Sequence, residues 1–184
     1  MKKVILISGK AQTGKDEAAK ILNSKLNNSL IVHFGDYVKY ICSQYFGWDG
    51  KKDEKGRETL QRIGTDVVRK RNPDFWIDII HNFISVFKYD FDYIIIPDTR
   101  FKNEIEKTKL LFPTITLRIN GKIRGEITEE QQRHISETEL DDYSFDYIID
   151  NSEDGIDKLE KKVDLFMIKT EKEYCDISEN ILVK

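Results

Sequence analysis

Several features that define whole classes of protein are scarce or missing in this 184-residue sequence. It has two cysteines, Cys42 and Cys175, which lie far apart and form no C-x-x-C pair, so a cysteine-based metal cluster is excluded and both are expected to be reduced thiols. The N-terminal apolar run, VILI at residues 4–7, is too short for a signal-peptide core or a membrane span. These absences predict a cytoplasmic protein without a membrane partner.

The sequence also lacks an excess of positive charge. Its 30 lysines and arginines are outnumbered by 33 aspartates and glutamates, so the chain offers no overall basic field for binding a nucleic acid polymer. What is present, 39% hydrophobic and 34% charged residues, is typical of a globular protein. The length favours one domain over residues 1–184, and the sequence is compatible with either a monomer or a homodimer.

Short apolar runs alternate with helical patterns along the chain. Continuous runs of this kind are typical of parallel strands that are buried on both faces. The alternation predicts a doubly wound α/β fold in which helices flank a five-stranded parallel sheet. The five runs are KKVILIS, SLIVHF, FDYIIIPDTR, TITLRIN and FDYIIDN.

Two segments between the second and third runs carry further expectations. The charged, glycine-punctuated stretch DGKKDEKGRE, residues 49–58, predicts an exposed and mobile connection. The stretch FWIDIIHNFISVF predicts a helix that follows a proline and carries Phe75, Ile79, Ile80 and Phe83 on its buried face.

The stretch SGKAQTGKDEAA contains the spacing Gly9-x-x-x-x-Gly14-Lys15 between the first strand and a helix. Such a loop turns its backbone N–H groups around phosphate oxygens, and its lysine reaches the outer phosphates of a nucleotide. The alternative is a glycine turn with a surface lysine. The residues expected to bind the phosphates of ATP are Gly9, Lys10, Ala11, Gln12, Thr13, Gly14, Lys15, Asp16 and Glu17.

Asp98 and Arg100, in IIIPDTR, follow a buried strand. Because the carboxyl ends of parallel strands face the ligand crevice, we expect both side chains beside the glycine loop. An aspartate there can hold Mg²⁺ directly or through water, and an arginine can clamp a phosphate. The alternative is a local ion pair on the surface.

The polar stretch at residues 120–134 predicts a small mobile lid, because phosphoryl transfer requires water to be excluded and charge to be neutralised. Its cations are Lys122, Arg124 and Arg133, with Arg118 at its entry, although these charges are equally compatible with a solvated surface. His134 and Glu137 follow in HISETELDD, and no catalytic role is assigned to them.

Taken together, these blocks resemble the phage-type deoxynucleoside monophosphate kinases of the P-loop kinase superfamily. The resemblance rests on SGKAQTGKD, LQRIGTD with PDFW, YDFDYIIIPDTRFKNEIE and HISETELDDYSFDYIIDN in this order, and it runs from about Lys3 to Phe166. The same blocks also resemble the animal-type phosphomevalonate kinases, which share a GKD loop. The GKD families have lost the hydroxyl that normally meets magnesium, so the resemblance implies that Mg²⁺ relies on Asp16, Asp98, water and the nucleotide.

The resemblance implies transfer of a phosphoryl group from ATP to a phosphate monoester, with an acceptor-binding region at about residues 35–75. Lys15, Arg69 and Arg100 match the family's catalytic cations, the last two facing the acceptor phosphate. Arg62 is a further candidate for that surface, and Trp76 is one of four aromatic residues that can supply a platform for a base, the others being Tyr37, Tyr40 and Trp48.

The predicted reaction converts ATP and a (deoxy)nucleoside monophosphate to ADP and the nucleoside diphosphate. Because the acceptor is already an anionic oxygen, alignment of two phosphates and neutralisation of charge suffice for catalysis. Phosphomevalonate kinase is the alternative enzyme. A regulatory protein that binds a nucleotide without an acceptor substrate is the alternative of another class.

Overall fold

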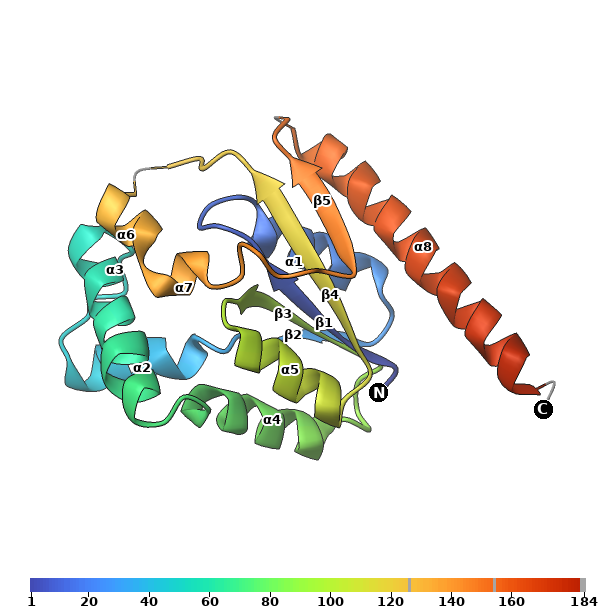
Figure 1. The fold of residues 1–184 in the computed structure, drawn as a ribbon, viewed down its shortest axis with the longest axis horizontal. Coiled ribbons are helices and arrows are strands. Elements are labelled where there is room, and N and C mark those ends of the chain that lie inside the picture. Colours follow the sequence, from blue (N-terminus) through green and yellow to red (C-terminus); the bar gives the residue numbers. More distant parts are fainter. Residues whose placement is uncertain (126, 154, 183–184) are drawn as a thin grey trace.

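The computed structural model describes the backbone of residues 1–125, 127–153 and 155–182, and the side chains up to residue 170. A five-stranded sheet in the order β2-β3-β1-β4-β5 forms its centre (Figure 1). All four strand pairings are parallel, which confirms the predicted α/β fold class. The strands are β1 (Lys3–Ser8), β2 (Ser29–Ile31), β3 (Tyr93–Thr99), β4 (Thr114–Gly121) and β5 (Tyr147–Asn151).

Helices cover both faces of the sheet (Figure 1). None of those in the described part of the chain combines the length and the apolarity that crossing a membrane demands. The helices are α1 (Lys15–Lys25), α2 (Asp36–Tyr45), α3 (Glu54–Gln61), the π-helical η1 (Arg62–Arg69), α4 (Phe75–Phe87), α5 (Lys102–Leu111), α6 (Glu129–Arg133), α7 (Ile135–Thr138) and α8 (Ile156–Leu182).

The central strand β1 divides the core into two layers, because successive side chains of a strand point to opposite faces. Ile5 and Ile7 pack in the layer that α1 and α8 cover, whereas Val4 and Leu6 pack in the layer that α4 and α5 cover. All four are at most 3% exposed. Strong burial on both faces explains why the sequence of β1 is continuously apolar rather than alternating.

A third, smaller core lies apart from the sheet and joins α2, η1 and α4. It contains Val38, Ile63 and Trp76 with the buried free thiol of Cys42. The prediction for Cys175 falls on a side chain outside the described part. This small core holds the helices that form one wall of the cavity described below.

The connection predicted at residues 49–58 is only partly correct. Helix α3 begins inside it, at Glu54, because the side chain of Asp53 accepts a hydrogen bond from the backbone N–H of Gly56 (2.9 Å) and so caps the helix. The charged sequence did not indicate this helix start, because a short helix with a solvent-exposed face has a composition similar to that of a loop.

The predicted buried face of α4 is also partly wrong. The buried residues are Trp76, Ile77, Ile80, His81 and Ile84. Phe75 and Phe83 are 38% and 36% exposed, and Ile79 is only partly buried, in the third core. The helix is apolar nearly all round, so periodicity alone did not fix which stripe meets the sheet.

His81 is a buried polar residue whose hydrogen bonds define its tautomer. The hydroxyl of Thr108 donates to the carbonyl of Glu104 (2.5 Å), so its oxygen accepts from Nε2–H of His81 (2.8 Å). Burial lowers the pKa of His81 below its usual value, since a charged ring would be desolvated.

This burial predicts a pH-dependent stability. Because the pKa of His81 is lower in the folded state, the unfolded chain binds the proton more readily, and the free energy of unfolding decreases as the pH falls below about 6.5. In denaturant unfolding at pH 7 and pH 5, the wild type should lose more stability than His81→Gln, which retains an N–H donor but does not titrate. An equal loss in the two proteins would contradict this account.

Candidate active site

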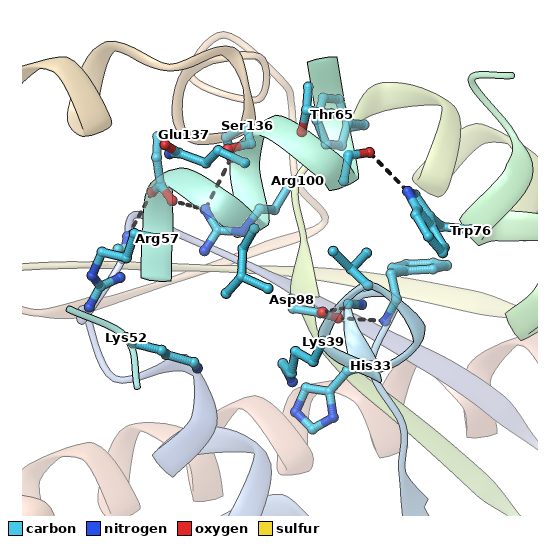
Figure 2. A pocket seen from close by; sticks show the side chains of 18 of the residues that line it. His33, Lys39, Lys52, Arg57, Thr65, Trp76, Asp98, Arg100, Ser136 and Glu137 are labelled. Atoms are coloured by element: carbon cyan, nitrogen blue, oxygen red, sulfur yellow. Dashed lines mark hydrogen bonds and ion pairs between the residues drawn. The ribbon is translucent and has the colours of Figure 1, made fainter. Parts of the chain in front are cut away.

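A cavity of about 390 Å³ opens at the carboxyl ends of the strands. The glycine loop and the start of α1 form one side, and α2, α3 and η1 form another. Figure 2 shows Lys52 and Arg57 at one side of this space, Trp76 at the opposite side, and Asp98 and Arg100 between them. The topology thus brings together segments that are far apart in the sequence, as expected for an open parallel sheet.

Two glycines give the loop its shape. Gly9 has φ 152° and Gly14 has φ 100°, conformations that other residues rarely adopt. A Cβ atom on Gly9 would lie 2.3 Å from the carbonyl oxygen of Ile119, and one on Gly14 would lie 2.5 Å from Nδ2 of Asn151. That same Nδ2 donates to the carbonyl of Thr13 (2.9 Å), so β5 holds the loop in place. Neither glycine tolerates a side chain.

Lys15 lies over this loop, as the spacing predicts. Its side chain is buried, and its Nζ donates to the carbonyl oxygen of Lys10 (2.6 Å). Burial, together with the positive charge of Arg100, lowers the pKa of Lys15 to about 7. A bound phosphate would stabilise the charged ammonium of Lys15.

The carboxylates offer one group suited to Mg²⁺. Asp16 is exposed in the first turn of α1 and lines the cavity, and no donor in the described part of the chain binds its carboxylate. Free carboxylate oxygens are the donors that Mg²⁺ prefers, and the ion usually keeps several waters, so the residues fit this metal. No group of three or more His, Cys, Asp or Glu residues that could hold a metal ion exists among the described residues.

Asp98 makes backbone contacts that the sequence did not indicate. Its two carboxylate oxygens accept hydrogen bonds from the backbone N–H groups of Phe34 (2.9 Å) and Gly35 (2.8 Å), immediately before α2 (Figure 2). Asp98 therefore ties the end of β3 to the start of α2. Both oxygens are engaged, which leaves Asp16 as the carboxylate more available to a metal.

Arg100 lies between the two sides of the cavity, as predicted. Its Nη1 donates to the carbonyl oxygen of Ser136 (3.0 Å) and to the carboxylate of Glu137 (Figure 2). The other oxygen of that carboxylate accepts from the backbone N–H of Ala11 in the glycine loop (2.8 Å). Glu137 was assigned no role from the sequence, because nothing local indicates that α7 meets this loop.

Arg69 also lines the cavity, and it is firmly anchored. Its guanidinium pairs with Glu104, donates to the carbonyl of Pro73 (3.4 Å) and lies 4.1 Å from the centre of the Phe101 ring. Glu104 is 1% exposed; burial raises the pKa of its carboxyl, and Arg69 opposes that shift. Glu104 also accepts from the backbone N–H of Arg100 (2.6 Å), so one buried acid positions both arginines.

Arg62 and Trp76, which were predicted to bind the acceptor, do not present an open side chain to the cavity. Arg62 is exposed and lies outside the cavity lining. Trp76 contributes to the lining, but it is 1% exposed and its indole N–H donates to the carbonyl of Gly64 (2.9 Å). It is therefore part of the wall rather than an open stacking platform. Tyr37 and Tyr40 are about half exposed on α2, outside the lining.

Part of the predicted lid, residues 120–134, folds as α6, which lies beside α3 and is followed by α7 (Figure 1). Gln131 of α6 is buried, and its Nε2 donates to the carbonyl of Glu54 at the start of α3 (3.2 Å). The segment therefore rests on α3 in this structure. Whether it moves stays a prediction.

The three arginines predicted for this lid have separate positions. Arg118 lies in β4 instead, where it is buried and bound to Ser8 (3.1 Å) and Asp141 (2.9 Å), because a strand position pointed it into the protein. Arg133 is exposed on α6 and pairs only with Glu129 (2.9 Å) among the described residues. Arg124 donates to the carbonyls of Asn151 (2.9 Å) and Glu153 (3.2 Å), next to Gly14.

Sequence reasoning missed two cations in the cavity. Lys52 and Arg57 line it from the segment that was predicted to be a loop. Within the described residues no hydrogen bond or ion pair engages either side chain. The sequence KKDEKGR contains both cations, but it also contains acids and so is typical of an exposed loop. The fold shows that Lys52 and Arg57 face the cavity.

The bonds of Asp98 predict the effect of a small substitution. Asp98→Asn replaces one acceptor by an N–H₂ group that faces a backbone donor, so the free energy of unfolding should fall by about 1–3 kcal/mol. Denaturant unfolding measures this, with Asp16→Asn as the exposed control, which should change little. If Asp98→Asn is as stable as the wild type, Asp98 does not hold the start of α2.

Solved structures of other proteins share this fold. The chain is similar to the solved structure of shikimate kinase from Bacteroides thetaiotaomicron, with a TM-score of 0.52 and 15% identity over 92% of this chain and 98% of that chain. It is also similar to the structure of a tunicamycin resistance protein from Deinococcus radiodurans, with a TM-score of 0.52 and 14% identity over 91% of this chain and 96% of that chain. At these identities they share the fold alone. No curated protein sequence matches the chain.

The sequence itself matches a family profile. The profile of deoxynucleotide monophosphate kinase covers residues 36–163, which is more than half of the chain. The matched region includes the acceptor side of the cavity, Asp98 and Arg100, and the segment from α6 to β5. The chain therefore belongs to the deoxynucleotide monophosphate kinase family.

Proposed function

We propose that this protein transfers the terminal phosphoryl group of ATP to a deoxynucleoside monophosphate and releases ADP and the deoxynucleoside diphosphate. The observation that supports this most directly is that Lys15 at the end of the glycine loop, Arg100 immediately after β3 and Arg57 of α3 line one cavity. Two phosphate groups held from opposite sides of such a cavity would face each other.

The donor side consists of the loop at Gly9–Asp16 and the start of α1. Its backbone N–H groups, except that of Ala11, which donates to Glu137, and the side chain of Lys15 bind the phosphates of ATP, helped by the positive end of the helix. Arg124 lies beside Gly14 and is placed to meet the nucleotide at the edge of this loop. Mg²⁺, held by Asp16 and the phosphates, would neutralise charge on the donor.

The acceptor side consists of Arg57, Lys52, Arg69 and Arg100. The first two are unpaired among the described residues, so they can bind an anion without breaking an existing contact. Arg69 and Arg100 are positioned by Glu104 and bind with less loss of side-chain entropy. The acceptor oxygen is already anionic, so the reaction needs no general base. The residues align the phosphates and exclude water.

Phosphomevalonate kinase and a nucleotide-binding regulator remain alternatives with different requirements. The family match favours a nucleotide as the acceptor. A regulator without an acceptor would have no use for unpaired cations that face the donor loop across a cavity. Both alternatives are separated from the proposal by the same experiment.

That experiment is an assay of ADP release coupled to NADH oxidation, with each of the four deoxynucleoside monophosphates, the ribonucleotides and phosphomevalonate as acceptors. Turnover should occur with at least one deoxynucleotide and disappear in Lys15→Ala. Turnover with phosphomevalonate alone, or ATP binding without turnover of any acceptor, would contradict the proposal.

Arg57 allows a specific test of the acceptor side. Arg57→Ala removes an unpaired cation from the cavity, so the KM for the deoxynucleotide should rise by about 10- to 100-fold, the usual range for loss of one charge-assisted contact. The KM for ATP should change little. Arg133→Ala removes an exposed arginine of α6, which lies outside the cavity lining, and is the matched control, with a KM within about twofold of the wild type. Equal effects of both variants would show that Arg57 does not contact the acceptor.

A further inference from the structure

We propose that Glu137 is a positioning residue for phosphoryl transfer, which orients Arg100 and fixes it to the donor loop. This inference rests on the proposed function, because it assigns Arg100 to the acceptor phosphate and the loop to ATP. It concerns a residue of HISETELDD to which the sequence pattern assigned no role.

The carboxylate of Glu137 joins the two sides of the site. One oxygen pairs with Nη1 of Arg100, and the other accepts from the backbone N–H of Ala11 (2.8 Å). The side chain is only 10% exposed, so solvent screens these contacts weakly. A single group therefore sets the separation between an acceptor arginine and the donor loop.

These contacts leave most of Arg100 available. Its side-chain bonds to Glu137 and to the carbonyl of Ser136 (3.0 Å) both use Nη1. In the described part of the chain, Nε and Nη2 of this guanidinium have no partner. That edge presents two parallel N–H donors, the arrangement that clamps a phosphate in a bidentate manner. Glu137 thus fixes one edge of the guanidinium and leaves the other to the acceptor.

A second contact keeps Glu137 itself in place. Nζ of Lys10 donates to the backbone carbonyl of Glu137 (2.8 Å) and pairs with the carboxylate of Asp141. Lys10 and Ala11 are neighbours in the glycine loop, so the segment from Glu137 to Asp141 is attached to this loop at three points. These contacts fix the position of Glu137 relative to the loop.

A different interpretation of the same contacts makes the opposite prediction. Because Glu137 binds an N–H of the glycine loop and the side chain of Arg100, this interpretation places its carboxylate in a phosphate position that a substrate has to clear. In the positioning account both oxygens are already satisfied and the phosphate meets the free edge of Arg100. Removing the charge then weakens acceptor binding, whereas clearing an occupied position would strengthen it.

The experiment is a double-mutant cycle of Glu137→Gln and Arg100→Ala. Glutamine has the same shape, but it retains only one acceptor oxygen and loses the ion pair. Glu129→Gln is the matched control, because the one side-chain contact of Glu129 within the described residues is an exposed ion pair with Arg133. Four quantities are measured for each protein: kcat, the Kd of ATP and the Kd of the deoxynucleotide by calorimetry, and the melting temperature.

We expect Glu137→Gln to lower kcat by about 10- to 100-fold, as small misplacements of reacting groups do, with the Kd of ATP within about threefold of the wild type. The deoxynucleotide should bind more weakly. In the Arg100→Ala background the same substitution should change this Kd by less than about twofold, because its effect passes through Arg100.

Three results would overturn the inference: a tighter Kd for the deoxynucleotide in Glu137→Gln, an equal loss of affinity with and without Arg100, or unchanged kinetics. A lower melting temperature with unchanged kcat would show a purely structural role and overturn it too. Absence of turnover in the wild type would instead refute the proposed function, while the binding cycle would still report on Glu137 and Arg100.

Discussion

The site depends above all on the parallel pairing of β1 with β3. Leu6 lies opposite Ile96 and Ser8 opposite Thr99, so the glycine loop that follows β1 and the arginine that follows β3 emerge at the same edge of the sheet. The register shifts between these pairs, where β3 contains Pro97 and Asp98. Apolar residues on both faces of the strands hold this pairing, and the polar residues at their ends need no other scaffold to meet.

Buried acids then give the cations their geometry. Glu104 is nearly inaccessible to solvent and binds the side chain of Arg69 and the backbone of Arg100. A buried carboxylate is costly unless several donors satisfy it, and here the backbone N–H groups of Arg100 and Phe101 and the guanidinium of Arg69 do so. Lys15 shows the opposite situation: burial and the nearby cation Arg100 lower its pKa, so a bound anion would favour its charged form. The arrangement suits a protein whose ligands carry many negative charges.

The sequence predicted the features that are local. Five strands followed from apolar runs, the glycine loop from its spacing, and the position of Arg100 from the rule that ligands bind at the carboxyl ends of parallel strands. The features that depend on contacts between distant segments were missed or misplaced. Glu137 contacts Ala11, which lies 126 positions away in the sequence. The position of Arg118 in β4 directs its side chain into the protein. Which charged residues of α3 face the cavity and which face solvent depends on how the helix packs. Residue patterns carry no information on such contacts.

The central claim is that donor and acceptor phosphates bind next to each other in one cavity. Calorimetry with a bisubstrate ligand, adenosine joined through five phosphates to the preferred deoxynucleoside, tests it most directly. If the sites adjoin, the second half binds at high effective concentration, and the linked ligand should bind at least about 100-fold more tightly than ATP. Affinity no greater than that of ATP would show that the cavity does not hold both substrates together.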